Sequence, residues 1–288
     1  MSHEMGHWDR TESQQEIDEA TAVLLRLRAH LEELEAPAPA LPGSMLATED
    51  ALTPREPLST LVRGMRNRAL DGLEMFMDAT VHEERELMWA RPIAPYALLR
   101  MSVEALGVGR WLVLHSHKNE RIMRALRLSL EHAEDAYEFA CLLSELDDRH
   151  ELLQRHRDVV ARLEQIKDSV GALRQRNLTR LPSYTDIQRA VSAPVLPGAS
   201  HEVDSPFLVW KMCSGVLHGN SSVIRAVSDI EQLGEWDSGM AEFRMTPKWG
   251  LLTGAIFTCL RELRTMDERT TFLGTHDYAE RPIVPSSI

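Results

Sequence analysis

Apolar residues recur with the helical period in nearly every long segment, and this pattern constrains the fold more than any other feature. Residues 16–35 carry one such stripe, and a second begins at Leu58 and runs toward Leu87. The apolar members of the second stripe are Leu61, Val62, Met65, Ala69, Leu73, Phe76 and Met77. A helix with one apolar stripe is stable when it packs against other helices. The sequence therefore predicts an all-α protein.

The middle of the chain adds three further helical segments. Residues 92–114 are apolar almost all round, and residues 120–143 follow after a short break. From Asp147 to Gln175, apolar residues repeat every seven positions, at Leu152, Val159, Ile166 and Leu173. Two or three heptads predict a protruding helical hairpin rather than a long coiled coil.

The later segments are shorter. A capped helix is expected from Ser183, and short alternating stretches around a turn in residues 235–245 predict one small β-hairpin near the C-terminus. Thr246–Pro247 supply a cap and a first-turn proline for a last helix that runs to about Met266. The expected architecture is a single helical bundle of about eight helices.

Composition shifts divide the 288 residues into three parts. Residues 1–57 hold an amphipathic helix and a Pro-rich stretch at 36–43, which is either a stiff linker or a mobile arm. Residues 58–267 form the predicted bundle domain, and residues 268–288 are a weakly patterned tail.

Charge and cysteine content limit the classes of partner and the compartment. The net charge of -12 argues against affinity for DNA or for an anionic membrane surface. The 3 cysteines lie far apart in apolar patterns, which suits a reducing cytoplasm. The N-terminal residues lack the pattern of a signal peptide, and no run of about 18 apolar residues is present. The sequence predicts a cytoplasmic protein.

Polar residues occupy helical faces that are otherwise apolar. Four-residue spacing places three polar-tipped side chains of residues 207–220 on one face, and a Gly-Asn pair closes that helix. The helix at 92–114 carries few charges, and buried charges are costly unless they are paired. These residues form either a structural cluster or the wall of a ligand pocket, and its predicted members are Arg100, Glu104, Trp111, Trp210, Ser214 and His218.

Two arginines at the start of the next helix are candidates for binding a phosphate. Arg121 and Arg124 are three residues apart and share one helical face. The alternative is that they pair with the abundant carboxylates of this acidic chain.

Two segments resemble a zinc site and a catalytic serine, but the sequence around each does not fit that chemistry. Residues 3–7 match the zinc-protease signature H-E-x-x-H, but they include Gly6 and precede the first periodic segment. Ser214 has neither a G-x-S-x-G turn nor a Gly-rich loop that could stabilise an oxyanion. We therefore predict no metal and no cofactor.

The residues Arg100, Glu104, Trp111-Leu112, Arg121 and Arg124, followed by Ser214, His218 and Gly219, resemble a pattern of uncharacterised bacterial all-helical proteins, R-x-x-x-E … W-L … S-x-x-x-H-G. That family is distantly similar to HEPN-type helical bundles. The resemblance covers residues 96–220 and implies a shared helical core with a polar cluster or pocket.

HEPN-type ribonucleases carry an arginine and a histidine a few residues apart. Arg110 and His115 have this spacing, as do the pairs at residues 127 and 132 and at residues 149 and 156. Chance alone predicts about 3.5 such pairs in a chain of this composition, so the spacing is uninformative.

Two functional classes remain open. The first is a helical binding or regulatory protein that takes a small-molecule or protein ligand and forms a homodimer through its N-terminal helix and hairpin. The alternative is a metal-independent endoribonuclease of the HEPN type, as in toxin or phage-defence systems, and only this alternative gives the protein an RNA partner.

Overall fold

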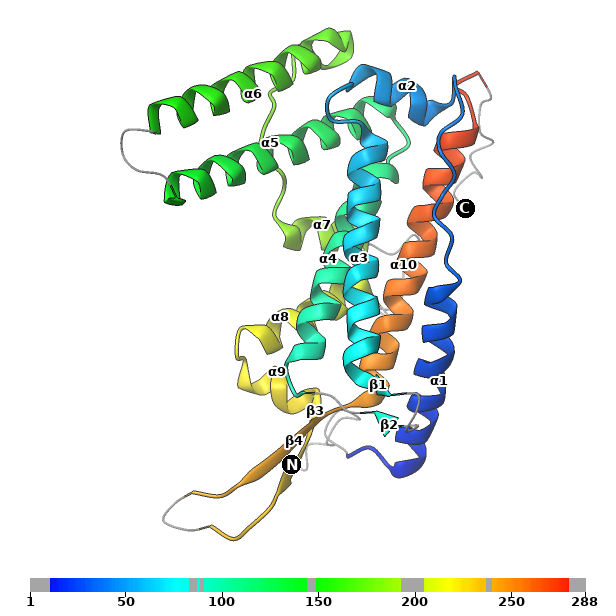
Figure 1. Cartoon of the computed structure of the whole chain (residues 1–288), viewed down its shortest axis with the longest axis vertical. Coiled ribbons are helices and arrows are strands. Elements are labelled where there is room, and N and C mark those ends of the chain that lie inside the picture. The colour runs from blue at the N-terminus through cyan, green and yellow to red at the C-terminus, as the bar shows by residue number, and fades with distance from the viewer. Residues whose placement is uncertain are drawn as a thin grey trace, which may run out of the picture. The chain divides into compact units, whose positions relative to one another are not determined.

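The computed structural model describes residues 11–82, 87–88, 91–143, 149–192, 205–236 and 240–279. Over these ranges the chain forms ten α-helices, and its only sheets are two small antiparallel pairs of strands (Figure 1). The predicted all-α fold class is confirmed. Within the same ranges, no helix has the length and apolar character needed to cross a membrane.

The elements follow one another in the order shown by the colours of Figure 1. They are α1 (Gln14–Glu32), α2 (Met45–Leu52), α3 (Leu58–Thr80), β1 (Val81–His82), β2 (Leu87–Met88), α4 (Ala94–Val113), α5 (Lys118–Leu143), α6 (Arg149–Ser169), the 3-10 helix η4 (Gly171–Leu173), α7 (Tyr184–Val191), α8 (Pro206–Leu217), α9 (Ser221–Ala226), β3 (Ser228–Gln232), β4 (Phe243–Pro247) and α10 (Trp249–Thr275).

The chain divides into two compact units. Unit 1 contains Met1–Glu35, Arg66–Gly107 and Gln188–Arg264, and unit 2 contains Ala36–Met65, Val108–Ile187 and Thr265–Ile288. The boundaries predicted at residues 57 and 267 stay predictions, and α10 continues through residue 267 without a break.

Helix α1 forms where the apolar stripe predicts it. Ser13 begins the helix through a capping box with Glu16, in which each side chain accepts a hydrogen bond from the other residue's backbone. The stripe is buried, and Leu24 has no exposed surface. Arg28 fixes the helix further, because its Nη1 donates to the carbonyl oxygen of Val81 over 3.1 Å.

Helix α3 ends earlier than predicted. The stripe was expected to continue toward Leu87, but the helix stops at Thr80, and Val81 instead begins a short antiparallel pair with β2. The hydroxyl of Thr80 donates to the carbonyl of Phe76, which occupies one of the last carbonyls of the helix.

The β3–β4 hairpin confirms the predicted hairpin near the C-terminus, although its strands lie outside residues 235–242. Ser228 pairs with Pro247 and Gln232 pairs with Phe243, so Thr246–Pro247 end a strand rather than begin the last helix. The start of α10 is capped from far away in the sequence: Glu12 accepts backbone hydrogen bonds from Trp249 (2.7 Å) and Gly250 (2.8 Å). A local sequence pattern cannot reveal such a distant cap.

Unit 2 contains the predicted helical hairpin, in which α5 and α6 run side by side (Figure 1). Helix α6 is shorter than the heptad pattern predicts, because it ends at Ser169 and a 3-10 turn follows. The apolar positions nevertheless share one core, whose buried members are Ile122, Met123, Leu126, Leu130, Leu163, Val170 and Leu173.

The Pro-rich stretch belongs to unit 2 and is fixed at two points. The backbone N–H of Leu41 donates to the carbonyl of Gly274 over 2.8 Å, and that of Met45 donates to the carbonyl of His276 over 2.7 Å. The stiff linker and the mobile arm both stay predictions. Helix α2, which the sequence analysis did not predict, follows directly.

Candidate functional site

Four of the six predicted cluster residues meet between α4 and α8 in unit 1. Arg100 and Glu104 lie one turn apart on α4, with 3.5 Å between Arg100 Nε and Glu104 Oε2. Arg100 Nη1 donates to Ser214 Oγ over 3.2 Å, and Trp210 Nε1 donates to Glu104 Oε2 over 3.3 Å. The two charges are therefore paired, and each also binds a polar group of α8.

Two cationic side chains lie over the ring of Trp210. The guanidinium carbon of Arg100 lies 5.3 Å from the ring centroid, and Lys211 Nζ lies 5.6 Å from it. Phe207 stacks on the same indole at 6.4 Å between centroids. The indole is 5% exposed, so it gives the two cations an apolar surface that water does not cover.

A pocket of about 780 Å³ lies between α8, α9 and the first turns of α10. Its wall is mainly apolar, and the apolar side chains are those of Leu208, Val209, Met212, Val223, Ala226, Val227, Leu251 and Ala255. Gly254 adds to the space, because a methyl group placed on its Cα would have no atom within 4 Å. This volume lies in the range of small-molecule binding sites.

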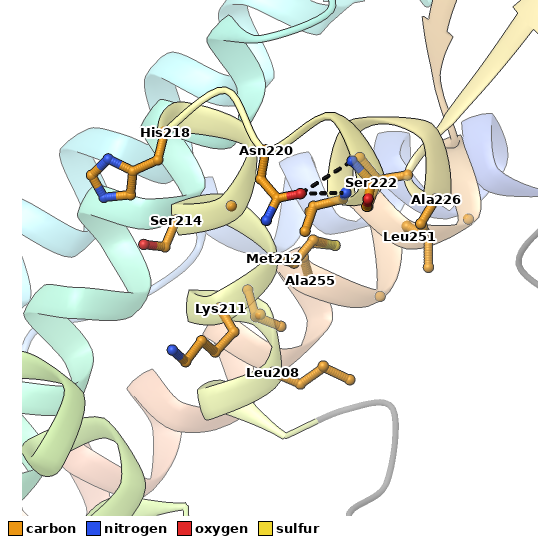
Figure 2. A pocket seen from close by; sticks show the side chains of 16 residues that line it. Leu208, Lys211, Met212, Ser214, His218, Asn220, Ser222, Ala226, Leu251 and Ala255 are labelled. Atoms are coloured by element: carbon orange, nitrogen blue, oxygen red, sulfur yellow. Dashed lines mark hydrogen bonds between the residues drawn. The ribbon is translucent and has the colours of Figure 1, made fainter.

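Three polar residues of the pocket lie along one stripe of α8, and two more, Asn220 and Ser222, lie at the start of α9. Figure 2 shows Lys211, Ser214 and His218 on one side of the helix, and Leu208 and Met212 nearer to α10. The three polar residues are three and four positions apart, which places them on one helical face. Ser214 therefore belongs both to the Arg100 cluster and to the pocket wall.

The end of α8 confirms the predicted closure by a Gly-Asn pair. His218 is the exposed C-cap residue of α8, and Gly219 takes a left-handed φ of +69°. Asn220 then caps α9, because its Oδ1 accepts from the backbone N–H groups of Ser222 (3.1 Å) and Val223 (3.2 Å). The backbone N–H of His218 donates to the carbonyl of Ser214 over 3.0 Å, but among the described residues no hydrogen bond joins their side chains.

The other three predicted residues lie in unit 2. Trp111 is buried and interacts with Arg124, whose Nη1 donates to the Trp111 carbonyl and whose guanidinium lies 4.8 Å from the indole centroid. Arg121 is fully buried and paired with Glu49, which is also fully buried. A phosphate cannot reach Arg121 in this geometry. Binding of a phosphate by Arg124 stays a prediction.

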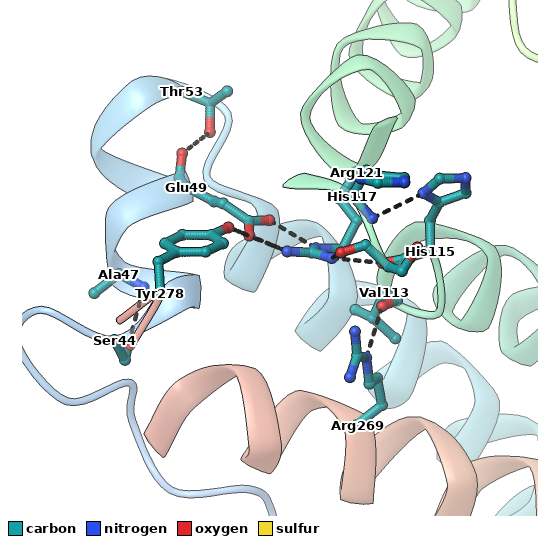
Figure 3. A network of polar contacts seen from close by, with 11 residues as sticks. Ser44, Ala47, Glu49, Thr53, Val113, His115, His117, Arg121, Arg269 and Tyr278 are labelled. Carbon is teal, nitrogen blue, oxygen red and sulfur yellow. Dashed lines mark hydrogen bonds and ion pairs between the residues drawn. The ribbon is translucent and has the colours of Figure 1, made fainter. Parts of the chain in front are cut away.

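Figure 3 shows how completely Arg121 is engaged. Its Nε donates to Glu49 Oε2 over 3.0 Å, and Nη1 donates to the carbonyls of His115 and Ser116. Its Nη2 donates to the hydroxyl of Tyr278 over 3.1 Å, and that hydroxyl donates to Glu49. Burial and the Glu49 carboxylate raise the pKa of Tyr278. This network joins α2, α5 and the segment after α10.

Contacts are found for two histidines of the arginine and histidine pairs, His115 and His156. Arg110 lies in the last turn of α4, and His115 lies beyond the helix end, where its Nδ1 accepts from the backbone N–H of His117 over 3.1 Å. Burial, and then the positive charge of Arg124, lower the pKa of His115. His156 stacks on Tyr137 at 4.8 Å between centroids.

Metal binding receives no support from the part of the chain that the structure describes, where no group of three or more His, Cys, Asp or Glu side chains could hold an ion. The H-E-x-x-H residues 3–7 lie outside the described residues.

The sequence analysis missed three contributors to this region. Lys211 and Gly254 shape the pocket, and Gln188 supports α4, because its Nε2 donates to the carbonyl of Val103 over 2.9 Å. The glycine at 107 makes this approach possible, since a Cβ there would lie 2.0 Å from Gln188 Nε2. Of these residues, only Lys211 could have been found from the local sequence, because it directly follows Trp210 on α8.

Comparisons with models of protein families, with curated proteins and with solved structures found no match. The resemblance to the bacterial family and to HEPN-type bundles therefore rests on the sequence motifs alone.

Proposed function

We propose that this protein binds an amphipathic small molecule in the pocket between α8, α9 and α10. The apolar part of the ligand would contact the α10 side of the pocket, and a hydrogen-bond-accepting or anionic end would lie at the polar stripe of α8. The observation that carries the proposal is the position of Ser214, a residue that lines an apolar pocket of about 780 Å³ and whose hydroxyl accepts a hydrogen bond from Arg100.

The polar stripe favours an anionic end over a cationic one. Lys211 contributes a positive charge, and no ion pair with Lys211 is found among the described residues. Arg100 adds a second cation next to Ser214. A carboxylate, sulfonate or phosphate group would gain charge-assisted hydrogen bonds there.

Two fluorescent probes test the proposal with the full chain. Anilinonaphthalene sulfonate has an apolar body and an anionic group, and N-phenyl-naphthylamine is similar in shape but uncharged. Replacing Lys211 with Met should weaken binding of the sulfonate probe by about 5-fold, as expected for losing one partly exposed charge contact. The affinity for the neutral probe should not change.

A second variant tests the pocket itself. Gly254→Leu places a side chain in open space inside the pocket and should weaken the binding of both probes by at least about 10-fold. Gly64→Leu is the matched control, because Gly64 is also helical and also has open space beside it, yet lies outside the pocket. Leucine favours helix over glycine, so both variants should stay folded. Equal probe binding in Gly254→Leu and the wild type would refute the pocket.

The cytoplasmic location and the endoribonuclease alternative stay predictions. The regulatory role also stays a prediction, since it depends on which molecule fills the pocket.

A further inference from the structure

The far end of α5 exposes a group of large apolar side chains. Phe139 is 63% exposed, Leu142 is 83% exposed and Leu143 is 72% exposed. Single exposed apolar residues are common on protein surfaces, but three within five positions of one helix form a patch of the kind that marks an interaction site.

A groove of about 380 Å³ lies between the same helix, α5, and α6. Its α5 side carries the small residues Ala133, Ala136 and Ala140, which leave space between the two helices. Phe139 lies three positions after Ala136, on the same side of the helix. The groove and the exposed residues at the end of α5 are together called the hairpin surface here. Its apolar members are Ala133, Ala136, Phe139, Ala140, Leu142, Leu143, Leu152 and Val159.

The groove also contains a polar atom without a partner. His156 Nε2 is buried and has no hydrogen bond, and its ring is held by stacking on Tyr137. The stacked ring forms part of the groove wall.

The two helices of the hairpin carry opposite charges. Between residues 129 and 143, α5 has Glu131, Glu134, Asp135 and Glu138 and no lysine or arginine, although Arg180 pairs with Glu134 and Glu138. Residues 149–162 of α6 have Arg149, Arg155, Arg157 and Arg162 against Glu151 and Asp158, and Arg155 pairs with Glu151. A partner of uniform charge would be repelled by one of the two helices. A second copy related by a two-fold axis can place its basic α6 against the acidic α5, and its acidic α5 against the basic α6.

We propose that the hairpin surface is where two copies of this chain associate, as an antiparallel arrangement of four helices. In this dimer, Phe139 of one copy occupies the groove of the other. The proposal is independent of the ligand pocket, and it assigns the predicted homodimer to the hairpin, since the apolar stripe of α1 is already buried.

Sedimentation equilibrium of the full chain tests the apolar part of the interface. The wild type should be a dimer, and Phe139→Glu should raise the dissociation constant by at least about 30-fold, because an aromatic anchor is lost on both sides of a two-fold interface. Phe257→Glu is the matched control: Phe257 is 57% exposed on α10, outside the hairpin, and its variant should dimerise as the wild type does.

A charge exchange tests the orientation. Asp135→Arg and Arg157→Glu change exposed residues, so both variants should fold, and each should weaken self-association by about 5-fold or more. An equal mixture of the two variants should form a heterodimer tighter than either homodimer, because the exchanged charges become complementary. A wild type that is monomeric at about 100 µM overturns the proposal, as do dimers that resist Phe139→Glu. The absence of a preferred heterodimer overturns the two-fold pairing of α5 with α6.

Discussion

Arg100 Nη1 donates a hydrogen bond to Ser214 Oγ over 3.2 Å, although 114 positions separate the two residues. A serine hydroxyl that accepts this bond keeps its own proton as a donor. Ser214 is also a residue of the pocket wall, and under the proposed function its proton would be donated to an acceptor on the ligand. The geometry suits recognition, and no base that could make Ser214 a nucleophile is hydrogen-bonded to it within the described residues.

The Arg100–Glu104 pair should contribute more to stability than an exposed pair of the same spacing. Replacing Glu104 with Ala removes the partner of Arg100 and the acceptor of Trp210, whose contacts lie in a partly buried site with side-chain exposures of 25% and 14% for the pair. The free energy of unfolding should fall by about 1–2 kcal/mol in urea denaturation, less than for a fully buried pair.

Glu151→Ala is the control for this measurement. Glu151 and Arg155 have the same separation, but their side chains are 67% and 71% exposed, so the loss should be below about 0.5 kcal/mol. Equal losses in the two variants would show that the Arg100 cluster does not stabilise the fold.

Loss of one partner should destabilise the fold more for the Glu49–Arg121 pair than for the Arg100–Glu104 pair, because neither Glu49 nor Arg121 has an exposed side-chain surface. Glu49→Ala leaves a buried guanidinium without its counter-charge and should cost about 3–5 kcal/mol in the same assay. The double variant Glu49→Leu with Arg121→Met should recover part of this loss, since it removes both charges. A double variant less stable than Glu49→Ala would contradict this account.

Thiol reactivity should separate Cys141 from the other two cysteines. Burial raises the pKa of Cys259 to about 12 and also raises the pKa of Cys213, so neither forms a thiolate near neutral pH. Cys141 is partly exposed on α5. A disulfide reagent should modify one thiol in the native protein and all three after unfolding. Rapid modification of a second thiol under native conditions would show that the core of unit 1 opens.

His115 should destabilise the fold as the pH falls. Its pKa is lowered from 6.5 by burial and by Arg124, so the unfolded chain binds the proton more readily than the folded chain. Its contribution to stability is therefore present above pH 6.5 and is lost as the pH falls through 6.5 toward the folded pKa. An NMR titration of the imidazole should give a midpoint below 6.5, and Arg124→Met should raise it. Arg162→Met, which removes a charge that does not act on His115, should leave the midpoint unchanged.

The same residue decides the ribonuclease alternative. We expect the purified protein to leave single-stranded RNA intact, because its net charge of -12 opposes binding of a polyanion. Cleavage that persists after purification and falls by about 10²–10⁴-fold in folded His115→Ala would establish the alternative instead.

Local patterns predicted the long helices well and the short elements poorly. The apolar stripe from Leu58 predicted α3, because a helix of six turns repeats its pattern often enough to be recognised. Helix α2 has 8 residues, and its Glu49 is fixed by Arg121, which is 72 positions away. No window of local sequence contains that contact.

The candidate site shows the same division. Polar residues on apolar faces predicted that Arg100, Glu104, Trp210 and Ser214 were unusual, since the cost of burying them requires partners. Which of them would meet depended on the packing of α4 against α8. Trp111 and Arg121 are also polar residues in an apolar pattern, yet they make other contacts, within unit 2: Trp111 with Arg124, and Arg121 with Glu49.

The hydrogen bonds from Leu41 and Met45 to the end of α10 have a consequence for synthesis on the ribosome. Both acceptors, and Tyr278 with its bond to Glu49, are translated more than two hundred residues after α2. We therefore expect helix α2 and the buried Glu49–Arg121 pair to become stable only after the last part of the chain has been synthesised. A nascent chain stalled before residue 274 should keep this region sensitive to protease, and release of the following residues should protect it.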